Sequence, residues 1–148
     1  MARMQTLDPQ LAGRLKGLAR LVGNTPLLAI EFTYRGKPRI LYAKSEQLNM
    51  TGSIKDRMAL FILEHAYAEG KISAGDAIAE ATSGNTGISF AALGRALGHP
   101  VTIFMPEWMS HERVDLIRSL GARIVLVGGE QGGFLGSIRM AEEMAAQQ

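Results

Sequence analysis

AIAEATSGNTGISFAALGRALGHPVTIFM, residues 77–105, is the stretch that decides the fold. It opens with a short strand-like run, Ala77–Ala81, and passes through a polar, glycine-containing loop into an apolar segment, Thr86–Leu97. Gly98 follows that segment and a proline comes two residues later, which is a common signal for the end of a helix. Val101–Met105 is then an apolar run of strand length. The stretch predicts strand, helix and strand, a crossover that joins parallel strands.

The same alternation continues to the end of the chain. We expect a helix from Ser110 to Leu120, a strand over Arg123–Val127 and a last helix over Phe134–Ala146. Short loops between alternating elements predict a three-layer α/β domain with a parallel sheet of about four strands. Ligands of such sheets bind beyond the carboxyl ends of the strands. That rule directs attention to two loops, 49–53 and 82–87.

The first 70 residues predict two helices and two strands. The helices cover 10–21 and Ser53–Glu69, and the strands cover Leu27–Phe32 and Arg39–Lys44. The first helix carries an apolar stripe that is typical of a helix docked on a core: Leu11, Leu15, Leu18 and Leu21. The second carries five apolar side chains on one face: Ile54, Met58, Phe61, Ile62 and Ala66.

Composition narrows the class of protein. The chain has 148 residues, 47% of them apolar, and a net charge of +2. This excludes a disordered chain and gives no reason to expect nucleic acid or an anionic membrane as partner. Cysteine is absent, which excludes disulfides and thiolate metal sites, and the three histidines show no metal-ligand spacing. With no signal peptide and no apolar run near the roughly 18 residues of a membrane helix, we expect a cytoplasmic protein without a bound metal.

The loop before the Ser53–Glu69 helix contains a lysine in an unusual place. Ser53 and Asp56 form an S-x-x-D pattern, which resembles a capping box and places Lys55 in the first helical turn. The positive end of the helix dipole disfavours an ammonium group there. The neutral amine is the form that attacks carbonyl groups and forms Schiff bases. The alternative is an exposed lysine in a surface turn.

The second loop is rich in hydrogen-bonding groups. Thr82, Ser83, Gly84, Asn85 and Thr86 bring together three hydroxyls, one amide and freely placed backbone N–H groups where a helix begins. Such a helix start suits a carboxylate or a phosphate. The loop has no lysine or arginine, so hydrogen bonds rather than full charge would orient the ligand. The alternative is a turn whose hydroxyls only satisfy backbone donors.

Several motifs together resemble one enzyme family, the cysteine synthases and cystathionine β-synthases. The order of the motifs along about residues 18–145 is the specific signal, and their form is most similar to B-type cysteine synthases. They are Leu21-Val22-Gly23-Asn24-Thr25-Pro26-Leu27, Lys44-Ser45-Glu46, Gly52-Ser53-Ile54-Lys55-Asp56-Arg57, Glu80-Ala81-Thr82-Ser83-Gly84-Asn85-Thr86-Gly87, Met105-Pro106-Glu107-Trp108-Met109-Ser110-His111-Glu112-Arg113 and Gly121-Ala122.

The resemblance implies a fold and a set of site residues. The fold is the tryptophan synthase β-like fold of pyridoxal-phosphate (PLP) enzymes, fold type II, here incomplete. Residues 41–148 would form its smaller, mobile domain, and residues 1–40 would pack on a larger domain that the chain lacks. Lys55 would hold PLP as a Schiff base and Asn85 would contact the ring oxygen of PLP. The substrate carboxylate would bind to Thr82, Ser83, Gly84, Asn85 and Thr86.

The resemblance also implies a reaction. An activated serine such as O-acetylserine would lose its β-substituent, and a sulfur donor would replace it to give cysteine, with Lys55 as acid and base. We expect the 148-residue chain by itself to be inactive, and to self-associate, for example as a homodimer. Related PLP lyases, of the cystathionine β-synthase or serine/threonine dehydratase type, remain alternatives. So does a non-catalytic half-protein that binds PLP, an amino acid or a partner. Gly128–Gly133 lacks G-x-G-x-x-G spacing, and we interpret it as structural.

Overall fold

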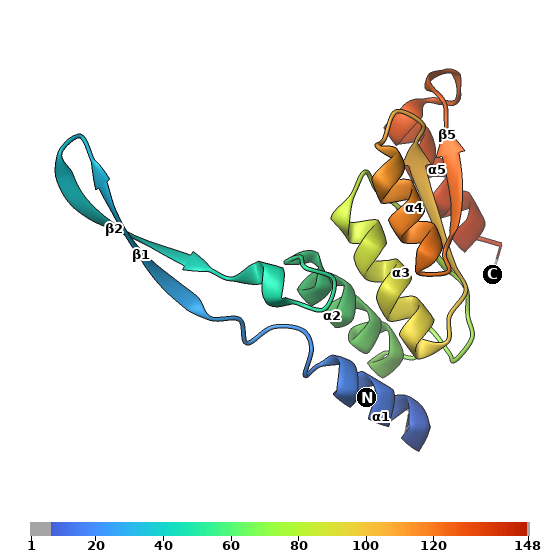
Figure 1. Ribbon diagram of the computed structural model, residues 1–148. Coiled ribbons are helices and arrows are strands. Elements are labelled where there is room, and N and C mark those ends of the chain that lie inside the picture. The colour runs from blue at the N-terminus through green and yellow to red at the C-terminus, as the bar shows by residue number, and fades with distance from the viewer. Residues whose placement is uncertain (1–6, 148) are drawn as a thin grey trace.

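The computed structural model describes residues 7–147 and shows an α/β body from which a long hairpin projects (Figure 1). The order of its elements closely follows the prediction. They are α1 (Pro9–Leu18), β1 (Leu27–Tyr34), β2 (Lys37–Lys44), a 3₁₀ turn (Glu46–Leu48), α2 (Lys55–Ala68), β3 (Ile78–Ala81), α3 (Asn85–Leu97), β4 (Val101–Pro106), α4 (His111–Ser119), β5 (Arg123–Val127), a 3₁₀ turn (Gly129–Gln131) and α5 (Gly133–Ala145).

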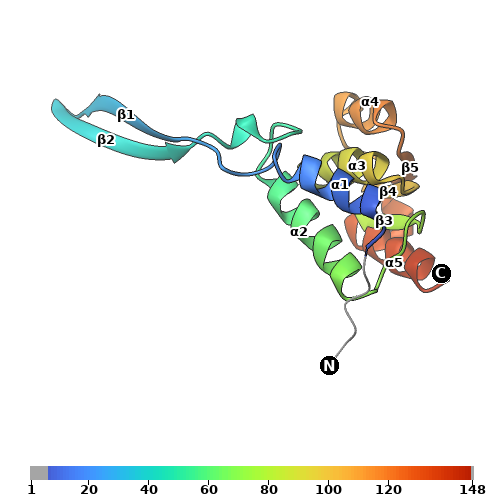
Figure 2. The same cartoon turned by 90° about the horizontal axis from the view of Figure 1, so that it is seen from below.

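The body is a three-layer sandwich around a parallel sheet. The strands lie in the order β3-β4-β5, and both strand pairs are parallel. Helices α3 and α4 cover one face of the sheet and α5 covers the other (Figure 2). All of β4 is buried because it lies between both neighbours and both helical layers. The predicted architecture is confirmed, although the described residues place three strands in this sheet rather than about four.

The two remaining strands form a separate antiparallel hairpin. Leu27 pairs with Lys44 at its base and Tyr34 with Lys37 at its tip. Arg35 and Gly36 connect the strands, with φ angles of 50° and 72°. Positive φ at both turn residues twists the chain in the sense that paired strands require. The hairpin points away from the body in both views (Figures 1 and 2), and every residue of β1 is exposed.

Helices α1, α2 and α3 share one hydrophobic core. Leu11, Leu15 and Leu18 are buried in it, which confirms three positions of the predicted stripe; Leu21 lies beyond the helix and is 56% exposed. Helix α2 does not bury the face that the five apolar side chains share, because Phe61 on that face is 58% exposed. The opposite face is buried, through Ala59, Leu60, Leu63 and Tyr67.

A second core lies between the sheet and helices α3 and α4. Ile103 of β4 and Ile117 of α4 are fully buried there, beside Ile88 of α3. On the other face, α5 approaches the sheet through small side chains. Its buried positions are Gly133, Gly136, Ser137 and Ala141. The first core packs α2 against α3, and the second packs α3 against the sheet. These contacts position the first turns of α2 and α3, which carry the candidate site.

Candidate functional site

Lys55 is the first residue of α2, and its side chain is exposed. The expected first-turn position is therefore confirmed, but the expected capping pattern is not. The Lys55 N–H donates to Ser53 Oγ at 3.2 Å, while the Asp56 N–H donates to the carbonyl oxygen of Ser53. Asp56 instead accepts from the N–H and the hydroxyl of Thr51, at 2.6 and 2.5 Å. Asp56 thus closes the loop before Lys55 onto the start of the helix.

The same carboxylate joins α2 to α3. Asp56 is fully buried, and Ser89 of α3 donates its hydroxyl to Asp56 Oδ1 at 2.6 Å. Ser89 Oγ also lies 3.0 Å from the carbonyl oxygen of Asn85, the first residue of α3. A buried carboxylate is stable when several donors surround it, as here. This network links the backbone next to Lys55 with the backbone of Asn85.

The loop at the carboxyl end of β3 forms the second side of the site. Thr82 is buried and its hydroxyl accepts from the Gly84 N–H at 3.1 Å. Ser83 and Asn85 are exposed, and Thr86 is half-buried. Gly84 is the N-cap of α3, and no side chain caps this helix among the described residues. The hydroxyl of Thr82 therefore serves a backbone donor, whereas the other polar side chains of the loop do not cap α3.

Gly87 allows this loop to lie tightly on the sheet. A Cβ atom at this position would lie 2.6 Å from Thr82 Cγ2 and 3.2 Å from Ile103 Cγ2. Contacts below 3.0 Å require movement of the neighbours. The first turn of α3 can therefore approach β3 and β4 only when residue 87 has no side chain.

A second polar cluster holds the segment before the lysine loop. Glu46 accepts from Arg57 Nε at 2.8 Å, from Thr25 Oγ1 at 2.6 Å and from Asn49 Nδ2 at 2.8 Å. Asn49 in turn accepts from the Gly23 N–H at 2.7 Å. These bonds, first those from Arg57, lower the pKa of Glu46 to about 2. The carboxylate stays ionised at neutral pH and ties the turn at 23–26 to the start of α2.

The structure thus brings the two predicted loops together, and it adds residues that the sequence argument did not assign. The S-x-x-D pattern predicts a capping role for Asp56, and the sequence motifs give no role to Ser89. One signal was present, since Ser89 is a hydroxyl within the apolar segment of α3, and a buried hydroxyl needs a partner. Arg113 is a third addition, because α4 carries it to the loop beside Gly84.

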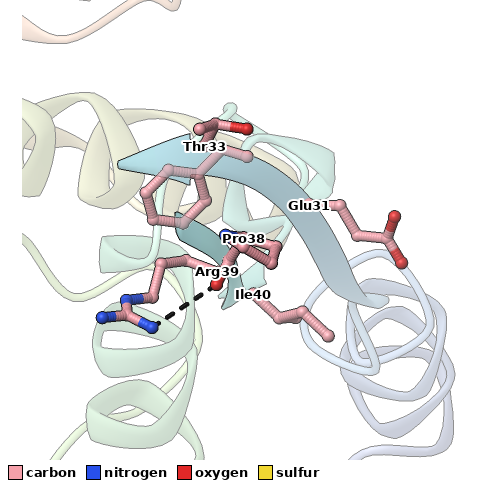
Figure 3. Close-up of a pocket in the computed structure, with 6 residues that line it drawn as sticks. Glu31, Thr33, Pro38, Arg39 and Ile40 are labelled. Atoms are coloured by element: carbon pink, nitrogen blue, oxygen red, sulfur yellow. Dashed lines mark hydrogen bonds between the residues drawn. The ribbon is translucent and has the colours of Figure 1, made fainter. Parts of the chain in front are cut away.

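Other surface features lie elsewhere. The hairpin forms a hollow of about 730 Å³ (Figure 3), where Arg39 bonds the Pro38 carbonyl, but none of the candidate residues lines it. Within residues 7–147 no cluster of three or more His, Cys, Asp or Glu side chains is arranged to hold a metal ion. Over the same range, no helix is both long and apolar enough to cross a membrane.

Comparison with known proteins identifies the family of this chain. The model of the family "pyridoxal-phosphate dependent enzyme" matches residues 18–148. The chain belongs to this family. It is 40% identical to cysteine synthase of Staphylococcus aureus strain Mu50, over 86% of this chain and 41% of the relative. It is also 40% identical to cysteine synthase B of Escherichia coli K12, over 86% of this chain and 42% of the relative.

A solved structure is more similar in sequence. A hydrogen sulfide-producing enzyme of Fusobacterium nucleatum shares 54% identity, with a TM-score of 0.88 over 92% of this chain and 41% of that chain. A D232N form of that enzyme has been solved with an α-aminoacrylate intermediate, and it superposes with a TM-score of 0.87. The chain therefore spans about two-fifths of the length of these relatives.

The side chains of the site fit the cofactor that gives the family its name. Lys55 supplies an exposed primary amine, the group that condenses with an aldehyde. Asn85 supplies an exposed carboxamide one helix start away, and the shared network through Asp56 fixes both backbones. An amine, an amide and a set of hydroxyls suit an aldehyde-bearing aromatic ring together with a carboxylate. The donors do not resemble a metal site.

Proposed function

We propose that this chain is the amino-terminal, cofactor-bearing part of a cysteine synthase-like enzyme. The observation that carries the proposal is the hydrogen bond between Asp56 and Ser89, which couples the start of the lysine helix to the start of α3, where the carboxylate loop ends. Family membership and the 40% identity to two cysteine synthases supply the chemistry. The proposed reaction replaces the β-substituent of an activated serine, such as O-acetylserine, with a sulfur nucleophile.

Each site residue then has a role. Lys55 would hold PLP covalently, and its amine, once free, would move the α-proton of the amino acid. Asn85 would bind the ring oxygen of PLP. Thr82, Ser83 and Thr86, with the backbone N–H groups around Gly84, bind and orient the substrate carboxylate. PLP, when bound, would supply an electron sink for the electron pair that stays on the α-carbon when the α-proton leaves.

A second candidate is sulfide release from cysteine. The 54% identity to the hydrogen sulfide-producing enzyme exceeds the 40% identity to the cysteine synthases, and this difference favours it. Both reactions begin with loss of a β-substituent, so the same Lys55 and the same carboxylate loop serve either one. The two candidates differ in the amino acid that enters and in the direction of sulfur transfer.

We further infer the setting in which the site works. Residues 41–148 act as the smaller, mobile domain together with α1, because the leucines of α1 are buried on α2 and α3. The rest of the amino-terminal segment, above all the exposed strand β1, packs on a larger domain in a cytoplasmic enzyme. Exposed apolar side chains support contact with a further domain or with a second chain, because Phe61, Leu27 and Tyr42 are 58, 60 and 65% exposed. We therefore expect self-association of the chain. A light-scattering mass of one chain at high protein concentration would contradict this expectation.

The proposed role of Lys55 is tested by labelling. The chain is mixed with PLP, reduced with borohydride and mapped by peptide mass. We expect the reduced adduct mainly on Lys55, and its loss in Lys55→Arg. Lys71→Arg is the matched control, since Lys71 is exposed and paired with Glu69 at 2.7 Å. Label spread evenly over the lysines would contradict the proposed site.

The two candidate reactions are separated by the amino acid that the PLP-loaded chain accepts. The cofactor absorbance is followed while O-acetylserine or cysteine is added. A change with O-acetylserine alone supports cysteine synthesis, and a change with cysteine alone supports sulfide release. No change with either would exclude amino-acid binding at this site in the 148-residue chain.

A further inference from the structure

Arg113 lies against the carboxylate loop although it comes from a different helix. Helix α4 packs beside α3 (Figure 1), and Arg113 is in its first turn. A Cβ atom built on Gly84 would lie 3.9 Å from both Cζ and Nε of Arg113. The guanidinium therefore borders the backbone that opens α3. The loop itself contains no lysine or arginine, so Arg113 brings a full positive charge to its edge.

The charge of Arg113 is available to a ligand. The ion pairs of residues 7–147 involve Arg57, Lys71, Arg118 and Arg139, and Arg113 is not among them. Its side chain is exposed. An arginine that is neither buried nor paired keeps its donors free, and a carboxylate accepts from a guanidinium more strongly than from neutral donors.

We propose that Arg113 is a specificity-determining residue that draws amino acids with a free carboxylate to the loop at 82–86. This inference rests on the proposed function, because it assigns a residue to the same carboxylate site. The guanidinium of Arg113, beside Gly84, attracts the ligand carboxylate over a long range, while the hydroxyls and N–H groups of the loop orient that carboxylate. It selects anionic ligands over their neutral amides.

The expected size of the effect follows from the exposure of Arg113. An exposed charge several ångströms from the ligand is screened by water, so its removal weakens binding by about three- to ten-fold rather than abolishing it. The contribution shrinks as salt is added, because the Debye length falls from about 10 Å at 0.1 M to about 3 Å at 1 M. A residue that only supports the fold would show no such salt dependence.

The test uses the full chain and acetate as the carboxylate probe, with acetamide as the neutral comparison. Amide NMR shifts of residues 83–86 report binding in wild type, Arg113→Gln, Arg113→Lys and Arg118→Gln. Arg118 is the matched control, on the same helix and 3.8 Å from Asp115. We expect Arg113→Gln to weaken acetate binding about three- to ten-fold, Arg113→Lys to retain most of it and Arg118→Gln to leave it unchanged.

Three results would overturn the inference. They are equal acetate affinity in Arg113→Gln and wild type, an equal loss in Arg113→Lys and Arg113→Gln, and no acetate shift at the loop in wild type. Unfolding curves of each variant show whether the fold is intact. Labelling of Lys55 by PLP is measured on the same variants. Because Arg113 does not hold PLP, selective labelling of Lys55 together with unchanged acetate affinity in Arg113→Gln refutes the role of Arg113 alone, whereas failed labelling refutes the proposed function.

Discussion

Replacing Asp56 with alanine tests the bond network that underlies the site. The substitution leaves the half-buried Thr51 N–H without its acceptor, which costs about 1–2 kcal/mol, and it removes two hydroxyl bonds to a carboxylate, each worth about 1 kcal/mol or more. We therefore expect the free energy of unfolding to fall by about 3–4 kcal/mol. Urea denaturation followed by circular dichroism measures this loss.

Two further variants grade the result. In Asp56→Asn the amide oxygen can accept from the Thr51 N–H while the amide nitrogen donates to the two hydroxyls, so the loss should be less than half as large. Asp115→Ala is the control, because Asp115 is 74% exposed and exposed ion pairs contribute about 0–1 kcal/mol. The reasoning is refuted if Asp56→Ala costs no more than Asp115→Ala. A double-mutant cycle with Ser89→Ala should give a coupling of about 1 kcal/mol or more.

The other predictions concern pH, backbone space and a buried hydrogen bond. The pKa of Glu46 is lowered from about 4.5 to about 2, so the ionised carboxylate stabilises the fold above pH 4.5, and this stabilisation is lost as the pH falls toward 2. Urea denaturation at pH 6 and pH 3 should therefore show a larger loss of stability in wild type than in Glu46→Gln. Gly87→Ala should lower the free energy of unfolding by about 1–3 kcal/mol, since Cβ would overlap its neighbours, and thermal unfolding would show this. Tyr67→Phe should cost about 1–3 kcal/mol by chemical denaturation, because buried His99 loses the hydroxyl that bonds its Nε2; equal stability would contradict that bond.

Glycine, proline and helix-capping residues in the sequence predicted most element boundaries. Gly98 has a φ of 90° at the C-cap of α3, and only glycine adopts that angle without strain. Because such signals are local, they can be read without knowledge of the rest of the fold. The strand Arg123–Val127 and the start of α2 near Lys55 were placed well for the same reason.

The buried face of α2 could not be predicted in the same way. The helix has apolar side chains on two sides, so periodicity alone does not decide which side packs. The leucines of α1 and the residues of α3 cover Leu60 and Leu63, whereas Phe61 and Ile62 remain exposed. Tertiary contacts with α1 and α3 decide between the two faces.

The site shows the same division between local and distant causes. Lys55 and the residues from Thr82 to Thr86 follow from helix starts and from a family resemblance, both of which are written in short segments of sequence. The contact between the two helix starts cannot be predicted in this way, because Asp56 and Ser89 are 33 positions apart and no motif links them. Arg113 reaches Gly84 across a similar distance. Sequence therefore predicts which groups do the chemistry, and the packing of α2, α3 and α4 decides which charges surround them.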